Sequence, residues 1–191
     1  GHGKSDGVGS QSIADYARVV VDFLDANHMS KAVFIGHSMG SAISLMLALD
    51  FPKRVLGLGL VGSGARLRVS PQILENTTSE AMFPLAIKLI NEAEFGPSVN
   101  PRLKELAAER MAEIRPAVLH GDFLACNEFN VMHRLGEITA PTLILCGADD
   151  LLTPMKYSVY LRDHIPGARL VTFPGAGHMV NFVDVPRDFV L

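Results

Sequence analysis

The sequence has 191 residues, of which 48% are hydrophobic, so it is long enough for one sizeable globular domain or for a domain with an insertion. Its formal net charge is −3 and it contains no run of lysine and arginine, which argues against a nucleic-acid partner and against an anionic membrane surface. No apolar run is long enough to span a membrane.

The two cysteines, Cys126 and Cys146, lie in apolar surroundings and show neither C-x-x-C nor Cys/His ligand spacing. We therefore expect buried free thiols rather than a metal site, which favours a reducing, cytoplasmic compartment.

The chain begins with a glycine-rich loop over residues 1–9 (GHGKSDGVG). Its Gly3-Lys4-Ser5 is reminiscent of a phosphate-binding loop, but the glycine required before it is not present, and Asp6-Gly7 stands where a helix should begin. A helix is predicted over residues 12–27, because Ser12 and Asp15 have capping-box spacing and apolar residues recur with helical periodicity.

Residues 31–50 (KAVFIGHSMGSAISLMLALD) are the most informative stretch. A short strand is predicted over 32–35 and a buried helix over 41–49, with G-x-S-x-G between them. We expect Gly36 and Gly40 to let two backbone segments pass close together, so that the Ser38 hydroxyl stands clear of the sheet. The backbone N–H of Met39, at the positive end of the helix, would then face an oxyanion. Ser38 is the candidate nucleophile, and a buried structural serine is the alternative.

A second G-x-S-x-G occurs at residues 3–7, around Ser5. No apolar strand precedes it and polar residues follow it, so we do not expect the same turn there.

Residues 55–61 (VLGLGLV) predict another buried strand, and the order strand, helix, strand implies a parallel sheet. Residues 62–140 show no convincing strand and suggest helices around 79–91, 102–115 and 117–132. Five prolines interrupt this span: Pro71, Pro84, Pro97, Pro101 and Pro116. A helical insertion between two strands of the sheet is therefore expected.

The sheet pattern returns at the end of the chain. Strands are predicted over 141–147 (PTLILCG) and 168–173, a helix over 154–165, a loop over 174–178 (PGAGH), and the start of a further helix at Pro186.

Three polar sites follow the predicted strands, at the edge where parallel sheets bind ligands: Ser38, the pair Asp149-Asp150, and His178. A serine needs a base, imidazole is the base suited to neutral pH, and a carboxylate orients the imidazole. The other histidines lack such a position, or, as with His37, should point away from the Ser38 hydroxyl. The chain order is Ser, Asp, His.

These motifs resemble the α/β-hydrolase fold superfamily over nearly the whole chain, in GHSMG, in GADDLLTP over 147–154 and in GAGH over 175–178. The resemblance implies a mostly parallel sheet with helices on both faces and an inserted helical cap. It divides the chain into a first part of the hydrolase core (1–63), a cap (64–140) and a second part of the core (141–191). Within GADDLLTP it implies Asp150 as the acid, with Asp149 as the alternative.

The loop at residues 1–5 looks like the family's G-x-G-x-S loop, which lies after the oxyanion motif. The resemblance therefore implies that the second oxyanion donor lies upstream of residue 1 and that the chain is a piece of a longer enzyme. The strand at 32–35 would then be an exposed apolar edge, so that this piece alone should be unstable or associate. A homo-oligomer is left open.

The resemblance implies a serine hydrolase that cleaves a small, largely apolar ester through an acyl-enzyme and needs no cofactor or metal. An enol-lactonase or a carbon–carbon bond hydrolase would use the same residues, and a small-molecule receptor without turnover is the alternative of another class. Candidate substrate-binding residues lie in the expected cap: Met82, Phe83, Leu85 and Phe123, with Phe95 and Met111 also considered. Arg66 and Arg68 could meet a substrate carboxylate, although solvated charges at the base of the cap are the simpler interpretation.

Overall fold

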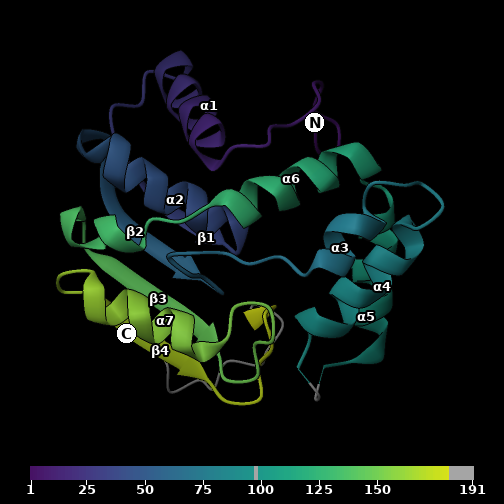
Figure 1. Cartoon of the computed structure of the whole chain (residues 1–191). Coiled ribbons are helices and arrows are strands. Elements are labelled where there is room, and N and C mark those ends of the chain that lie inside the picture. Colours follow the sequence, from purple (N-terminus) through teal and green to yellow (C-terminus); the bar gives the residue numbers. More distant parts are fainter. Residues whose placement is uncertain (97–98, 181–191) are drawn as a thin grey trace.

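The computed structural model describes residues 1–96 and 99–180 and places four strands in one parallel sheet (Figure 1). The strand order β1-β2-β3-β4 follows the chain, and the register joins Val33 to Gly57, Leu58 to Thr142, and Leu143 to Arg169. The strands are β1 (Ala32–His37), β2 (Val55–Val61), β3 (Thr142–Gly147) and β4 (Arg169–Phe173). The predicted parallel sheet is confirmed, and the strand bounds agree to within two residues.

Three helices pack beside these strands: α1 (Ile13–Ala26), α2 (Met39–Asp50) and α7 (Met155–His164). Ser12 caps α1, its side chain accepting a hydrogen bond from the N–H of Asp15, as the capping pattern predicts. The helix α2 begins two residues before the predicted start, directly after Ser38. A short 3₁₀ turn, η1 (Pro52–Arg54), leads from α2 into β2.

The segment between β2 and β3 is helical, as expected. It contains α3 (Pro71–Asn76), α4 (Phe83–Glu94), α5 (Pro101–Ala112), α6 (Pro116–Glu128) and the 3₁₀ turn η2 (Met132–Glu137). Four of the five prolines begin these helices, since each of α3 to α6 has a proline in its first two positions, and the fifth, Pro97, lies outside the described residues. Proline fits there because the first N–H groups of a helix have no intrahelical acceptor. The helix α3 was not predicted.

Two hydrophobic clusters support this arrangement. The larger one packs α2, α6 and α7 against the sheet around Leu45, Leu60, Ile144 and Leu161, each fully or almost fully buried. The smaller one lies among the inserted helices and is formed by Ile73, Phe83, Ile87, Ile90 and Leu119. Burial in two separate clusters gives the inserted helices a core of their own beside the sheet.

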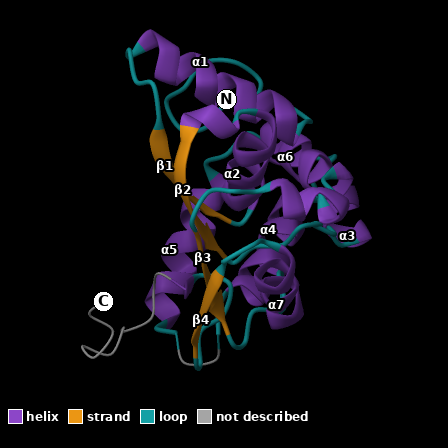
Figure 2. Cartoon of the chain, turned by 90° about the vertical axis from the view of Figure 1, so that its left-hand side faces the viewer, coloured by secondary structure: helices purple, strands orange, loops and turns teal. Residues whose placement is uncertain are grey.

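Strand β1 is the edge of the described sheet. Val33 and Ile35, which point to the same face, are 58% and 76% exposed. Figure 2 shows α1, α2 and α6 on the opposite side of β1 and β2. The expected apolar edge strand is therefore present, while the helix predicted from Pro186 lies outside the described residues. Across residues 1–96 and 99–180, no helix combines the length and apolar character that a membrane crossing requires.

Candidate functional site

Ser38 occupies a sharp turn between β1 and α2, with backbone angles φ 53° and ψ −117°. A non-glycine residue at positive φ is strained, and strain of this kind persists only where the surroundings hold it. Gly36 makes the turn possible, because a Cβ atom there would lie 2.1 Å from the carbonyl oxygen of Gly40. The prediction for Gly40 itself was wrong, since a Cβ on Gly40 would meet no atom within 4 Å.

Hydrogen bonds fix this turn to the neighbouring strand. The N–H of Ser38 donates to the carbonyl of Val61 (2.9 Å), and the Ser41 hydroxyl donates to the carbonyl of Gly36 (2.7 Å). Met39 is the first residue of α2, so its N–H has no acceptor within the helix and lies at the positive end of the helix dipole. The arrangement can stabilise negative charge on an oxygen beside Ser38. The second donor that the family resemblance implies stays a prediction.

Asp150 and His178 meet at the carboxyl ends of β3 and β4. His178 Nδ1 lies 2.8 Å from Asp150 Oδ2, and the two residues are only 2% and 4% exposed. Because an ionised carboxylate can only accept, Nδ1 carries the proton of this hydrogen bond and Nε2 is left as the acceptor. Asp149 is exposed, and only its backbone N–H is engaged, with the carbonyl of Ala176. The structure therefore pairs His178 with Asp150 and not with Asp149.

Thr153 holds the carboxylate and was not singled out by sequence. Its hydroxyl donates to Asp150 Oδ2 (2.7 Å) and lies 3.1 Å from His178 Nδ1. The backbone N–H groups of Leu152 and Thr153 donate to Asp150 Oδ1. Burial by itself would raise the pKa of Asp150, but the bond from His178, its charge, and the bonds from Thr153 outweigh burial and lower that pKa. The carboxylate thus stays ionised beside the imidazole.

His37 and Gly62 position the ring of His178, and sequence reasoning missed both. His37 Nε2 lies 3.0 Å from the His178 carbonyl oxygen, and the two ring centroids are 4.6 Å apart. Burial, followed by the charge of His178, lowers the pKa of His37, which favours its neutral form. Gly62 has φ 51°, and a Cβ there would lie 3.0 Å from two atoms of the His178 ring. The sequence offered one indication that Gly62 lies at the site, namely its position directly after β2.

The loop that carries His178 is fixed by close backbone contacts. A Cβ on Gly147 would lie 2.1 Å from the carbonyl oxygen of Gly177, and one on Gly177 would lie 2.3 Å from the nitrogen of Gly96. The N–H of Met179 also donates to the carbonyl of Glu94 (3.0 Å), at the end of α4. Three segments far apart in the chain therefore cross at this loop without room for a side chain.

A cavity of about 190 Å³ opens beside Ser38, and Phe123 is one of its walls, as predicted. The other walls come from the segment after β2, from α3 and α6, and from the loop after β3: Leu67, Arg68, Val69, Ser70, Ile73, Cys126, Leu151, Leu152 and Thr153. Most of these were not predicted, although those after β2 and β3 follow strands. Cys126 and Cys146 are buried free thiols, as expected, and burial raises the pKa of Cys126 to about 12.

The structure does not bring Met82, Phe83 or Leu85 to this cavity, and these expectations are corrected. Phe83 is buried in the small cluster of the inserted helices, while Met82 and Leu85 are 43% and 42% exposed. Met111 also packs against that cluster, and Phe95 is buried. The reason is that helical periodicity shows which residues are apolar but not which side of a helix faces the cavity.

The second G-x-S-x-G, around Ser5, forms a different structure. The N–H of Ser5 donates to the carbonyl of His2 in an exposed turn, with no strand before it and no helix directly after it. His2 reaches Asp122 on α6 (2.6 Å), and the hydroxyl of Tyr16 donates to the same carboxylate. These contacts hold the N-terminal loop against α6. Among the described residues, neither an imidazole nor a carboxylate is hydrogen-bonded to the Ser5 side chain.

Comparison with known proteins identifies relatives of this arrangement. A family model described as the alpha/beta hydrolase fold matches residues 1–185. The 2-hydroxy-6-oxononadienedioate/2-hydroxy-6-oxononatrienedioate hydrolase of Comamonas testosteroni is 31% identical over 87% of this chain and 63% of its own length. The pimeloyl-acyl-carrier-protein methyl ester esterase of Nitrosomonas europaea is 28% identical over 100% of this chain and 79% of its own length.

A solved structure of a thermophilic esterase is 38% identical and superposes with a TM-score of 0.83, covering 94% of this chain and 70% of that one. The chain thus spans less than two thirds of the Comamonas relative and somewhat more of the other two proteins.

Proposed function

The chain belongs to the alpha/beta hydrolase fold family, and from that premise we propose that it is a serine hydrolase cleaving a small, largely apolar carboxylic ester. The observation that carries the proposal is the combination of a strained, cavity-lining Ser38 with a buried His178–Asp150 pair, 2.8 Å apart, at the same edge of the sheet. Nucleophile, base and orienting acid are the three parts that acyl transfer by serine requires.

The proposed reaction begins with attack of the Ser38 hydroxyl on the ester carbon. His178 Nε2 takes the hydroxyl proton and returns it to the alcohol that leaves, and Asp150 stabilises the imidazolium formed in between. The N–H of Met39 donates to the oxyanion. Water, activated by the same imidazole, then attacks the acyl-enzyme and releases the acid. His178 passes the proton taken from water to the Ser38 oxygen as the acyl–oxygen bond breaks, which restores the free hydroxyl and the neutral imidazole.

The cavity beside Ser38 supports a small apolar substrate. Leu67, Val69, Ile73 and Phe123 are among its walls, and its volume of about 190 Å³ suits a short acyl or alcohol group. The names of two similar proteins, both esterases, point to the same bond class.

A second candidate reaction follows from the Comamonas relative, whose name is that of a hydrolase of a dicarboxylate rather than of an ester. The same residues could then serve carbon–carbon bond hydrolysis, or lactone opening. A panel of short p-nitrophenyl esters, an enol-lactone and a vinylogous 1,5-diketone acid, assayed side by side, separates these reactions by kcat/KM.

The decisive experiment is labelling of the complete gene product with a fluorophosphonate, followed by peptide mapping. We expect an adduct on Ser38 that Ser38→Ala abolishes. Ser5→Ala is the matched control, because Ser5 lies in the other G-x-S-x-G and should leave labelling unchanged. A folded protein that shows no adduct and no turnover on the panel would overturn the hydrolase proposal and favour a receptor without turnover.

A further inference from the structure

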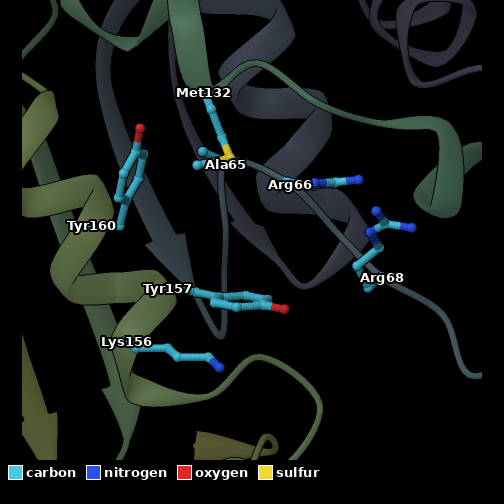
Figure 3. A pocket seen from close by; sticks show the side chains of 7 residues that line it. All are labelled: Ala65, Arg66, Arg68, Met132, Lys156, Tyr157 and Tyr160. Atoms are coloured by element: carbon cyan, nitrogen blue, oxygen red, sulfur yellow. The ribbon is translucent and has the colours of Figure 1, made fainter.

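A second cavity, of about 340 Å³, neighbours the Ser38 cavity and shares Arg68 with it (Figure 3). It is formed between residues 65–68 and helix α7, with Met132 of η2 closing one side. Its size falls within the range of roughly 300–1,000 Å³ that is usual for small-molecule pockets. We propose that this cavity binds a small aromatic carboxylate, at a site separate from the catalytic cavity.

The apolar walls are held in place before any ligand arrives. Tyr157 packs on the backbone, since a Cβ on Gly64 would lie 2.9 Å from the Tyr157 ring. Tyr160 stacks on His164, with ring centroids 3.8 Å apart. The floor is fixed by a backbone bridge between Arg66 and Asn130. Walls of this kind offer aromatic faces at little entropic cost on binding.

Three cations line the cavity, Arg66, Arg68 and Lys156, and among the described residues no acidic side chain does. Figure 3 shows both guanidinium groups, the Lys156 ammonium and the Tyr157 hydroxyl directed toward the same side. Lys156 and Tyr157 lie in the first turn of α7, whose positive end adds to the field there. Arginine forks bind a carboxylate through two parallel hydrogen bonds, and a flat aromatic body fits beside the tyrosines.

At this place the described residues supply no counter-ion. Most arginines in residues 1–96 and 99–180 pair with a carboxylate: Arg18, Arg54, Arg102, Arg110, Arg134 and Arg162. Within the same described residues, Arg66, Arg68 and Lys156 form no ion pair, although the chain has more acidic than basic residues. An anion from outside would supply the missing partner.

The two cavities are neighbours with different linings. Leu67 faces the Ser38 cavity, Ala65 and Arg66 face the second one, and Arg68 lines both. The proposed site therefore differs from the pocket in which an ester would react, and its existence does not depend on hydrolysis by Ser38.

The test is isothermal titration calorimetry with benzoate, using neutral benzamide as its isosteric control. We expect benzoate to bind with a Kd that rises about tenfold in Arg66→Gln and in Lys156→Gln, as loss of a charge-assisted hydrogen bond predicts. Benzamide should bind at least about tenfold more weakly than benzoate. Arg169→Gln is the matched control, because Arg169 is an exposed arginine of β4 away from this cavity, and it should leave the Kd unchanged.

Two further variants decide where benzoate binds. Phe123 lines the Ser38 cavity and packs on the small cluster but does not line the second cavity, so Phe123→Ala should leave the Kd unchanged. Lys156 is exposed, so its variant keeps the test valid if Arg66→Gln proves unstable in a thermal melt. Equal binding of benzoate to wild type, Arg66→Gln and Lys156→Gln, or a Kd that changes only in Phe123→Ala, would overturn the proposal.

Discussion

The turn that carries Ser38 and the loop that carries His178 are built in different ways. The turn is local: Gly36, Ser38 and Gly40 are neighbours in the chain, and the clash that demands glycine at 36 is with the carbonyl of residue 40. The loop is assembled from a distance, since Gly177 packs on Gly96 and Gly147, and His178 packs on His37 and Gly62. A nucleophile can therefore be identified from a short motif, whereas the position of its base depends on the whole fold.

The largest expected effect concerns Asp150, the acid that pairs with His178 in the part of the site built from distant segments. Asp150→Asn should lower kcat for a p-nitrophenyl ester by about 10⁴-fold, because an amide cannot stabilise the imidazolium and can favour the wrong tautomer. Asp149→Asn, at the exposed neighbour, should leave kcat near the wild-type value. Equal losses in the two variants would contradict the pairing of His178 with Asp150 alone.

The local turn is tested by a pair of alanine substitutions with opposite expected signs. Gly36→Ala places a methyl group 2.1 Å from the Gly40 carbonyl oxygen, and it should lower the free energy of unfolding by about 3 kcal/mol or more. Gly40→Ala meets no atom within 4 Å and lies in α2, so it should be neutral or stabilise by up to about 1 kcal/mol. Urea unfolding of both variants is the measurement. Similar losses of unfolding free energy in the two variants would contradict the claim that only position 36 requires glycine.

The close backbone crossing at the His178 loop predicts a loss of rate. Gly177→Ala must push the loop away from Gly96, and a displacement on the order of 1 Å at the base costs about 10²-fold in kcat. Gly136→Ala, where a Cβ would meet no atom within 4 Å, is the control and should keep the wild-type rate. If kcat is retained in Gly177→Ala, the loop is not held by this crossing.

The smallest expected effect concerns pH. The pKa of Asp150 is lowered in the folded protein, so its carboxylate stabilises the fold at pH above the unfolded value and this contribution is lost as pH falls through the lower, folded value. The free energy of unfolding should therefore fall more steeply for wild type than for Asp150→Asn as pH drops below about 4. Chemical unfolding at several acidic pH values measures both slopes, and parallel curves would count against this linkage.

Local pattern was enough to predict much of the fold. The alternation of apolar strands and helices, the cap at Ser12 and the turn at Ser38 are all decided by residues close in sequence, and the structure confirms these elements. The same reasoning set helices directly after Pro101 and Pro116, close to the observed starts of α5 and α6. It placed Pro84 inside a helix over 79–91, whereas Pro84 lies in the first two positions of α4.

The candidate site was only partly accessible to such reasoning. The rule that ligands bind beyond the ends of parallel strands gathered Ser38, the pair Asp149-Asp150 and His178. The family resemblance favoured Asp150, and the structure places His178 on Asp150. The rule could not show that Thr153, His37 and Gly62 contact the His178–Asp150 pair. It also could not distinguish Phe123, which lines the cavity, from Phe83, which is buried in the small cluster.

The sequence by itself determined the parallel sheet, the turn at Ser38 and the three strand ends from which a site could be assembled, because periodicity and steric demand at glycine act over a few residues. Only the tertiary structure decided which carboxylate meets the imidazole, which side chains line each cavity, and that Arg66, Arg68 and Lys156 face one space without a counter-ion. These outcomes depend on distances between segments far apart in the chain, and packing of the folded backbone sets those distances.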